Sequence, residues 1–264
     1  MHILPKPAWF FLGIQSINLS CGKMKNPKLD VPRGYLGAIA TTCLTSIAVV
    51  FLSCSLVPGV FEFKEQFRPL TQGFQHMFAL SRPYATIFSL PATVSSGFGF
   101  MFYFGQQLMS MGQSGLIHPA LGYESPQHKS PVVALVFGSV VGYVLCALSL
   151  WVPSARKQVY NISMLGAFAT YFSELASFIA FRMYYPTIQR EFVSPVGIPG
   201  AVYGCGVFLL AFASVAGFQK TSEAIVSFAI LTILASVYYY LVVRKRQVFS
   251  EEEKTVMFKA YLVK

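Results

Sequence analysis

Long apolar runs separated by short polar segments dominate the chain. A transmembrane helix needs about 20 mainly apolar residues at a rise of about 1.5 Å per residue. Runs that reach or approach this length cover residues 35–57, 84–109, 131–151, 158–181, 200–217 and 221–243. A shorter, interrupted run precedes them at residues 7–22. The pattern predicts an all-α polytopic membrane protein with seven transmembrane segments, the first of them broken.

The first segment is too polar for a simple span, because Gly13, Gln15, Ser16 and Asn18 interrupt it. A helix that enters the membrane, unwinds at a glycine and then resumes would give this pattern. Non-helical backbone is tolerated at membrane depth only where it is buried in protein or lines a cavity. Discontinuous helices of this kind hold the substrate in many secondary transporters. The alternative is a frayed core helix of a soluble protein.

Two polar connections carry structural predictions. A basic loop covers residues 23–33, and Pro27 and Pro32 predict that it is not helical. Within residues 59–83, four apolar side chains fall near helical spacing: Leu70, Phe74, Met77 and Phe78. They predict a short helix that either lies on the membrane surface or packs against neighbouring helices.

Glu174 is the only acidic residue in the middle of a predicted span. Thr170, Tyr171 and Ser177 lie at helical spacing from it and share its face. A carboxylate inside a membrane is costly and is a functional candidate by default. The alternative is a carboxyl group neutralised by burial and hydrogen-bonded to a neighbouring helix.

The composition agrees with a membrane protein, because 55% of the 264 residues are apolar and 11% are charged, against about 25% charged in ordinary soluble domains. The net charge of +10 could indicate nucleic-acid binding, but the charges cluster between apolar runs as they do in cytoplasmic loops. We therefore expect no nucleic-acid partner. Placing residues 23–33 in the cytoplasm puts most Lys and Arg residues on that side, together with the C-terminus.

The sequence carries no pattern of an enzyme or a cofactor site. The five Cys residues are scattered without a C-x-x-C pair, and the four His residues lack ligand spacing. No nucleophile–base pair, phosphate loop or metal-ligand cluster is recognisable in the sequence. We therefore expect no metal, no cofactor and no enzymatic activity.

Residues 9–34 read WFFLGIQSINLSCGKMKNPKLDVPRG. This stretch resembles the sixth helix and following loop of amino acid permeases of the amino acid–polyamine–organocation family, where the pattern is roughly W-x-F-x-G-x-E-S and then K-N-P-K-x-x-V-P-R. Three later stretches resemble the family in order: residues 105–119 the end of the eighth helix, QHKSPV at residues 127–132 the start of the ninth, and EFVSPVGIPG at residues 191–200 the loop between the tenth and eleventh. The ethanolamine and amino acid permease branch is the most similar.

The resemblance implies a LeuT-like fold of twelve helices, in which the first ten form two inverted five-helix repeats. This chain resembles helices six to twelve of that plan, as a single membrane domain over residues 1–264. Residues 7–181 would be the second repeat, residues 200–243 the last two helices and residues 244–264 a cytoplasmic tail. The first repeat is not in this sequence, so we expect a fragment, a truncated product or the partner of a separate N-terminal half.

The resemblance also implies a substrate site in the broken segment. Trp9 aligns with a gating aromatic residue, and Leu12 and Gly13 align with residues that line the substrate pocket. Unwound backbone after Gly13 would offer free polar groups to the substrate. The expected substrate-binding residues are Trp9, Leu12, Gly13, Ile14, Gln15 and Ser16. Gln15 stands where many relatives have a Glu that couples protons or conformation, and Glu174 could supply that carboxylate instead.

These features predict secondary active transport of an amino acid or a related amine across a lipid bilayer, with the plasma membrane as the default location. The alternative is a protein that does not transport by itself: a membrane scaffold, a regulatory paralogue or an inert fragment.

Overall fold

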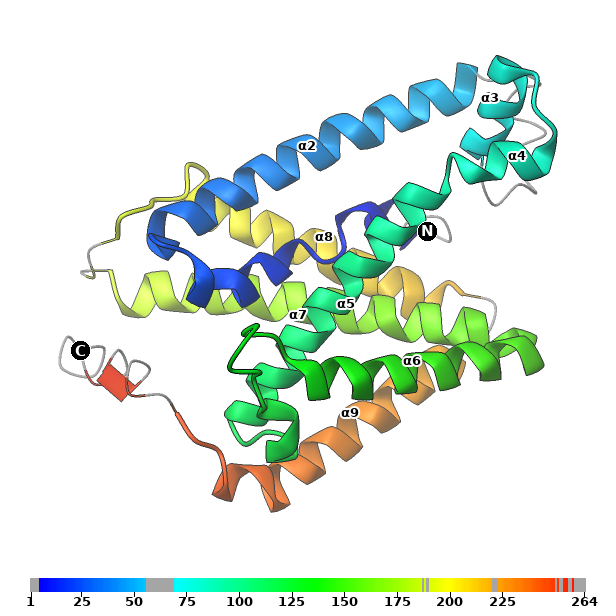
Figure 1. Ribbon diagram of the computed structural model, residues 1–264. Coiled ribbons are helices and arrows are strands. Elements are labelled where there is room, and N and C mark those ends of the chain that lie inside the picture. Colours follow the sequence, from blue (N-terminus) through cyan, green and yellow to red (C-terminus); the bar gives the residue numbers. More distant parts are fainter. Residues whose placement is uncertain are drawn as a thin grey trace.

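The computed structural model describes residues 5–55, 69–186, 188, 190–219 and 223–249, together with residues 251, 254, 255 and 258. Every regular element in these residues is helical, which confirms the predicted all-α class (Figure 1). The α-helices are α1 (Pro5–Ala8), α2 (Pro27–Ser55), α3 (Pro69–Phe78), α4 (Arg82–Ile87), α5 (Leu90–Gln113), α6 (Val132–Trp151), α7 (Pro153–Tyr184), α8 (Gly197–Gly217) and α9 (Glu223–Leu241). The 3-10 helices are η1 (Trp9–Phe11), η2 (Ile14–Lys23), η4 (Pro119–Gly122) and η5 (Val243–Lys245).

Within the described residues, six helical stretches are long and apolar enough to cross a membrane: Pro27–Ser55, Arg82–Gln113, Val132–Trp151, Ser154–Tyr184, Gly197–Gly217 and Glu223–Lys245. They correspond in order to the six full-length segments expected from the sequence. Thr221 and Ser222, at the predicted start of the last segment, lie outside the described residues.

The predicted break in the first segment is present. Leu12 is extended, with φ −72° and ψ 139°, and Gly13 is left-handed, with φ 91°. L-residues with a side chain rarely adopt such a φ, so the glycine permits the turn. After the break the chain resumes as the 3-10 helix η2 rather than as an α-helix.

The prediction that residues 23–33 are not helical is wrong, because α2 already begins at Pro27. A proline at the first helical position loses no hydrogen bond, since that N–H has no partner inside a helix. The Asn26 carbonyl accepts the backbone N–H groups of Leu29 and Asp30, and the Asp30 carboxylate accepts the Asn26 N–H at 3.3 Å. These contacts satisfy backbone groups at the start of α2, and Pro32 lies inside the same helix.

The predicted short helix before the third segment is confirmed as α3. Its Phe74 and Phe78 rings each lie with their centroids 5.3 Å from that of Phe88, which follows α4. Because Phe78 is still 47% exposed, this stacking covers the aromatic side of α3 only in part, and both the membrane-surface and the packing alternative stay open. The third membrane segment itself is bent, because α4 ends at Ile87 and α5 starts at Leu90.

The core lies between α7 and α8. Met164, Leu165 and Phe168 of α7 pack against Ala211 and Val215 of α8, and all five side chains are buried. The absence of a side chain at Gly204 of α8 lets α7 and α8 approach closely. A Cβ added there would lie only 2.8 Å from Cδ1 of Leu175 on α7. Small residues at such contacts let membrane helices approach one another.

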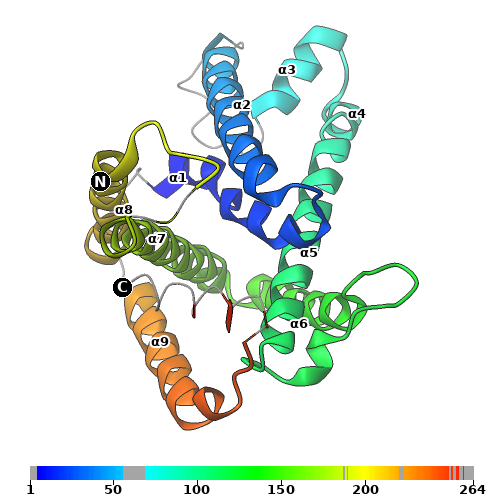
Figure 2. The ribbon, with the colours of Figure 1, turned by 90° about the vertical axis from the view of Figure 1, so that its left-hand side faces the viewer.

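The broken segment lies between α2 on one side and the α7–α8 pair on the other (Figure 2). Helix α9 packs along α7, and α5 packs against α6. The outer faces of α2, α6 and α9 expose many large apolar side chains, such as Phe51, Leu150 and Ile233. Such faces suit lipid or further membrane helices.

Candidate functional site

A cavity of about 540 Å³ lies where the broken segment meets α2, α7 and α8. Its walls are mostly apolar and include several aromatic rings. The lining residues are Pro7, Ala8, Phe11, Ile14, Gln15, Tyr35, Ile39, Phe168, Tyr171, Glu174, Val207, Phe208 and Ala211. Three of the residues expected from the sequence are among them: Ile14, Gln15 and Glu174.

The hydroxyl of Tyr171 on α7 holds the two sides of the helix break together. It accepts the backbone N–H of Gly13 at 3.2 Å. It also lies 3.1 Å from the Phe11 carbonyl and 2.6 Å from Oε1 of Gln15, and its single hydrogen is donated to one of these two acceptors at a time. One α7 side chain therefore contacts the chain before, at and after the break.

Gln15 is held from two directions. The Tyr35 hydroxyl of α2 donates to the Gln15 backbone carbonyl at 2.9 Å, while the side-chain amide meets Tyr171 of α7. The broken segment thus connects α2 with α7 through hydrogen bonds at adjacent groups of a single residue. A movement of α2 relative to α7 would have to break or rearrange these bonds.

Both backbone groups of Gly13 have hydrogen-bond partners within the protein in this conformation. Its N–H bonds to Tyr171, and its carbonyl accepts both the backbone N–H of Ser16, at 3.0 Å, and the Ser16 hydroxyl. Ser16 is buried, so its side chain closes the turn instead of facing the cavity. A substrate that used these backbone groups would have to displace Tyr171 or Ser16.

Trp9 and Leu12 do not line the cavity. The Trp9 ring packs beside Phe100 of α5 and Tyr160 of α7, with centroids 6.5 Å and 5.3 Å away. Leu12 packs against the α7–α8 core. From this region Pro7, Ala8 and Phe11 also line the cavity, and sequence reasoning did not select them.

Glu174 carries the only carboxylate among the lining residues. Its side chain is exposed at the cavity, on the α7 face that also presents Tyr171. A carboxylate at this depth of a membrane span is favoured only beside water, a partner helix or a bound cation. Beside Gln15 and aromatic walls, it can bind an ammonium group or carry a proton. No group of His, Cys, Asp and Glu suited to a metal ion occurs in the described part of the chain.

Replacing Gly13 with Ala should destabilise the helix break. The nearest atom to an added Cβ is the Ser16 hydroxyl oxygen at 4.0 Å, so the cost arises from the positive φ and not from crowding. A left-handed L-residue costs about 1–2 kcal/mol, and we expect a loss of this size in the free energy of unfolding, followed by circular dichroism in detergent. Gly22→Ala is the matched control, because Gly22 has open space and no positive φ. An equal loss in both variants would contradict the role of the Gly13 conformation.

A discontinuous helix beside a cavity with a few polar groups, within a bundle of membrane-length helices, is the arrangement of a membrane transporter. The family described as "Amino acid permease" matches residues 3–254. The chain therefore belongs to the amino acid permease family.

Two relatives illustrate the match. The branched-chain amino acid permease BcaP of Bacillus subtilis (strain 168) is 24% identical over 239 residues, which cover 89% of this chain and 48% of the relative. The polyamine transporter RMV1 of Arabidopsis thaliana is 27% identical over 128 residues, which cover 48% of this chain and 24% of the relative. The matched part of the chain thus spans about half the length of BcaP and about a quarter of the length of RMV1. No solved structure matches the chain significantly.

Proposed function

We propose that this chain forms the second half of a secondary active transporter for amino acids or related amines. The observation that carries the proposal is the cavity in which Gln15 of the broken segment meets Tyr171 and Glu174 of α7. Membership of the amino acid permease family supports the same activity.

The chemistry of the cavity fits a substrate with an ammonium group and an apolar body. The Glu174 carboxylate can pair with the ammonium group, and the rings of Phe11, Phe168 and Phe208 can cover an apolar side chain. The two relatives are named for branched-chain amino acids and for polyamines, which share an amino group and methyl or methylene carbons. We propose the ethanolamine and amino acid permease branch as the finer placement, on the motifs of residues 9–34 and 191–200.

We further propose that residues 7–181 act as one inverted repeat and residues 200–243 as the last two helices. The first repeat would come from further polypeptide or from a separate chain. The exposed Glu174 and the apolar outer face of α2 support this, because both suit covering by additional helices. The C-terminus would then be cytoplasmic, in line with the basic residues 244–246, and the plasma membrane is the proposed location.

In the proposed transport cycle, the break at Gly13 is the hinge for alternating access. Tyr171 holds the unloaded site by occupying the Gly13 N–H. A substrate carboxylate or hydroxyl would replace the Tyr171 hydroxyl at this N–H, which frees the broken segment to move relative to α7. Binding energy would in this way be coupled to a conformational change.

The test is uptake of labelled apolar amino acids, ethanolamine and short polyamines into vesicles. The chain is assayed alone and together with the first half of a homologous permease. We expect uptake only with the first half, because one repeat provides half of a site. Uptake by the chain alone would contradict the two-repeat proposal. No uptake in either arm, with both halves shown to reach the membrane, would favour the scaffold or inert-fragment alternative.

The non-transporting alternative has two specific observations in its favour. The Gly13 backbone is satisfied by Tyr171 and Ser16, and Gln15 is neutral where many relatives have a carboxylate. A site closed in this way would suit a protein that keeps the fold and has lost transport. Binding of the same labelled panel to purified chain plus first half separates the two, since a closed site binds none of them.

A further inference from the structure

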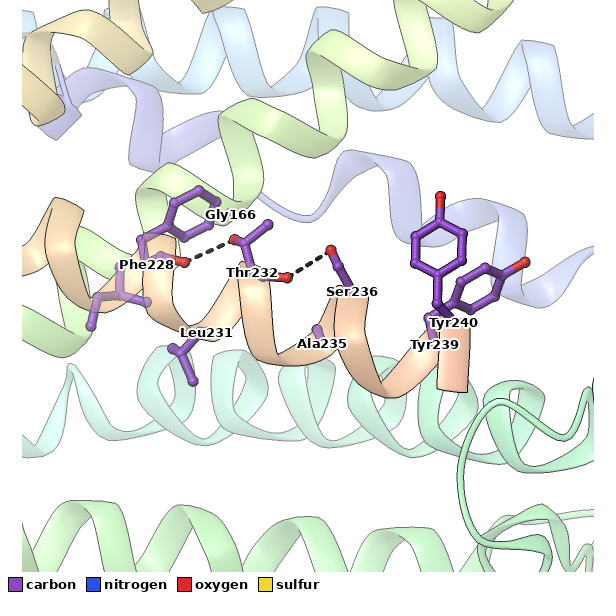
Figure 3. A pocket seen from close by; sticks show the side chains of 9 residues that line it. Gly166, Phe228, Leu231, Thr232, Ala235, Ser236, Tyr239 and Tyr240 are labelled. Atoms are coloured by element: carbon purple, nitrogen blue, oxygen red, sulfur yellow. Dashed lines mark hydrogen bonds between the residues drawn. The ribbon is translucent and has the colours of Figure 1, made fainter. Parts of the chain in front are cut away.

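A second cavity, of about 630 Å³, forms a groove between α7 and α9 (Figure 3). Ile162 and Gly166 of α7 form one wall, and α9 forms the other from Phe228 to Tyr240. At 1.5 Å per residue, that length of α9 is about 18 Å, a little more than one leaflet of a hydrocarbon core about 30 Å thick.

The groove offers an apolar surface despite its hydroxyl groups. The Thr232 hydroxyl donates to the Phe228 carbonyl and the Ser236 hydroxyl donates to the Thr232 carbonyl, both at 2.8 Å (Figure 3). Because these donors are used within α9, the two side chains present mainly carbon to a ligand. On the α7 side, Gly166 has no side chain that could fill the groove. A Cβ added there would have its nearest neighbour, the Phe228 ring, at 4.0 Å. The groove therefore suits a hydrocarbon chain.

Polar side chains lie beyond both ends of the groove. Before its first α9 residue, the Gln158 side chain of α7 donates to the Glu223 carboxylate at the start of α9, and Ala224 is buried. Tyr239 and Tyr240 lie at the other end (Figure 3). Arg244, Lys245 and Arg246 follow after three apolar residues.

The basic cluster, defined as residues 244–246, is held in place beside the groove. Val243 is buried, and its carbonyl accepts the backbone N–H groups of Arg246 and Gln247, both at 2.8 Å. The Tyr239 hydroxyl donates to the Gln247 side chain at 3.1 Å, which connects the turn to a residue that lines the groove. The three basic side chains are exposed, and none of the ion pairs between described residues involves them.

We propose that this groove binds an anionic phospholipid of the surrounding bilayer, with one acyl chain along α9 and the phosphate at the basic cluster. An apolar slot of one leaflet's length that ends in three positive charges matches a lipid in both shape and charge. The proposed orientation places this end at the cytoplasmic leaflet, which carries the anionic lipids. The proposal does not depend on whether the chain transports.

The test is native mass spectrometry of the full chain from bilayers that contain equal amounts of phosphatidylserine and phosphatidylcholine. We expect the chain to retain phosphatidylserine preferentially after delipidation. Since each basic residue near a membrane strengthens anionic-lipid binding about fivefold, the R244Q/K245Q/R246Q variant should lose the preference by at least about tenfold. R156Q/K157Q is the control, because it removes two exposed positive charges at the start of α7.

A second pair of variants tests the groove itself. A235F fills it, whereas A229F adds the same ring to an exposed α9 position outside it. We expect A235F alone to reduce phosphatidylserine retention. Equal retention of the two lipids, retention unaffected by A235F, or displacement by soluble glycerophosphoserine would each overturn the proposal. A dimer mass that A235F abolishes would assign the groove to a second copy of the chain instead.

Discussion

Replacing Tyr171 with Phe should lower the KM for uptake about tenfold in vesicles that contain this chain and a complementary first half, because the substrate no longer has to displace the hydroxyl from the Gly13 N–H. The variant keeps the ring in the cavity but removes the hydroxyl that meets Gly13, Phe11 and Gln15. The Gly13 N–H then has no partner in the described chain. A polar group left unsatisfied in a buried site costs about 1–3 kcal/mol, and 1.4 kcal/mol is a factor of ten in an equilibrium constant.

Tyr143→Phe is the matched control for this experiment. It makes the same chemical change on α6, where the ring is 79% exposed and lies outside the cavity. We expect its uptake to equal that of the unaltered chain. If Tyr171→Phe also transports normally, with equal amounts of protein in the membrane, the hydroxyl does not control the broken segment and the proposed hinge is wrong.

The membrane fold could be predicted from the sequence because it depends on local pattern. An uninterrupted apolar run such as residues 131–151 has one stable form in a bilayer, a helix that satisfies its own backbone. The break was equally local, since Gly13 supplies the positive φ and the polar residues Gln15 and Ser16 lie within the next three positions. The start of α2 was missed because the rule that proline disrupts a helix does not hold at its first position, which Pro27 occupies.

The composition of the site was less predictable. Tyr171 lies 158 residues from Gly13, and nothing in either local sequence reports their hydrogen bond. The only available signal was the helical spacing that puts Tyr171 on the face of Glu174. Trp9 lies in the 3-10 helix η1, and Leu12 is the extended residue that follows it. The lining set implied by the resemblance carried no information on these local conformations, and Phe11 takes a place in the cavity.

Replacing Glu174 with Gln should remove the dependence of uptake on external pH. We propose that this carboxyl group carries the coupled proton, because it is the only carboxylate that lines the cavity and Gln15 cannot titrate. Acidifying the outer medium raises the protonated fraction of an outward-facing carboxyl group, so the unaltered chain should transport faster at lower pH. The amide of the variant cannot release a proton, so its uptake should be slow and unchanged across the same range.

The double variant Gln15→Glu/Glu174→Gln distinguishes proton coupling from a structural role of Glu174. It moves the carboxylate across the cavity to the position where many relatives have one, and it keeps the net charge of the site. If proton coupling needs only a carboxylate facing this cavity, the double variant should regain a pH-dependent uptake that Glu174→Gln lacks. Glu124→Gln, a change of the same kind in an exposed loop, should leave the pH profile as it is. A Glu174→Gln profile that matches the unaltered chain would assign the carboxylate to substrate binding or to packing and would remove it from the proton path.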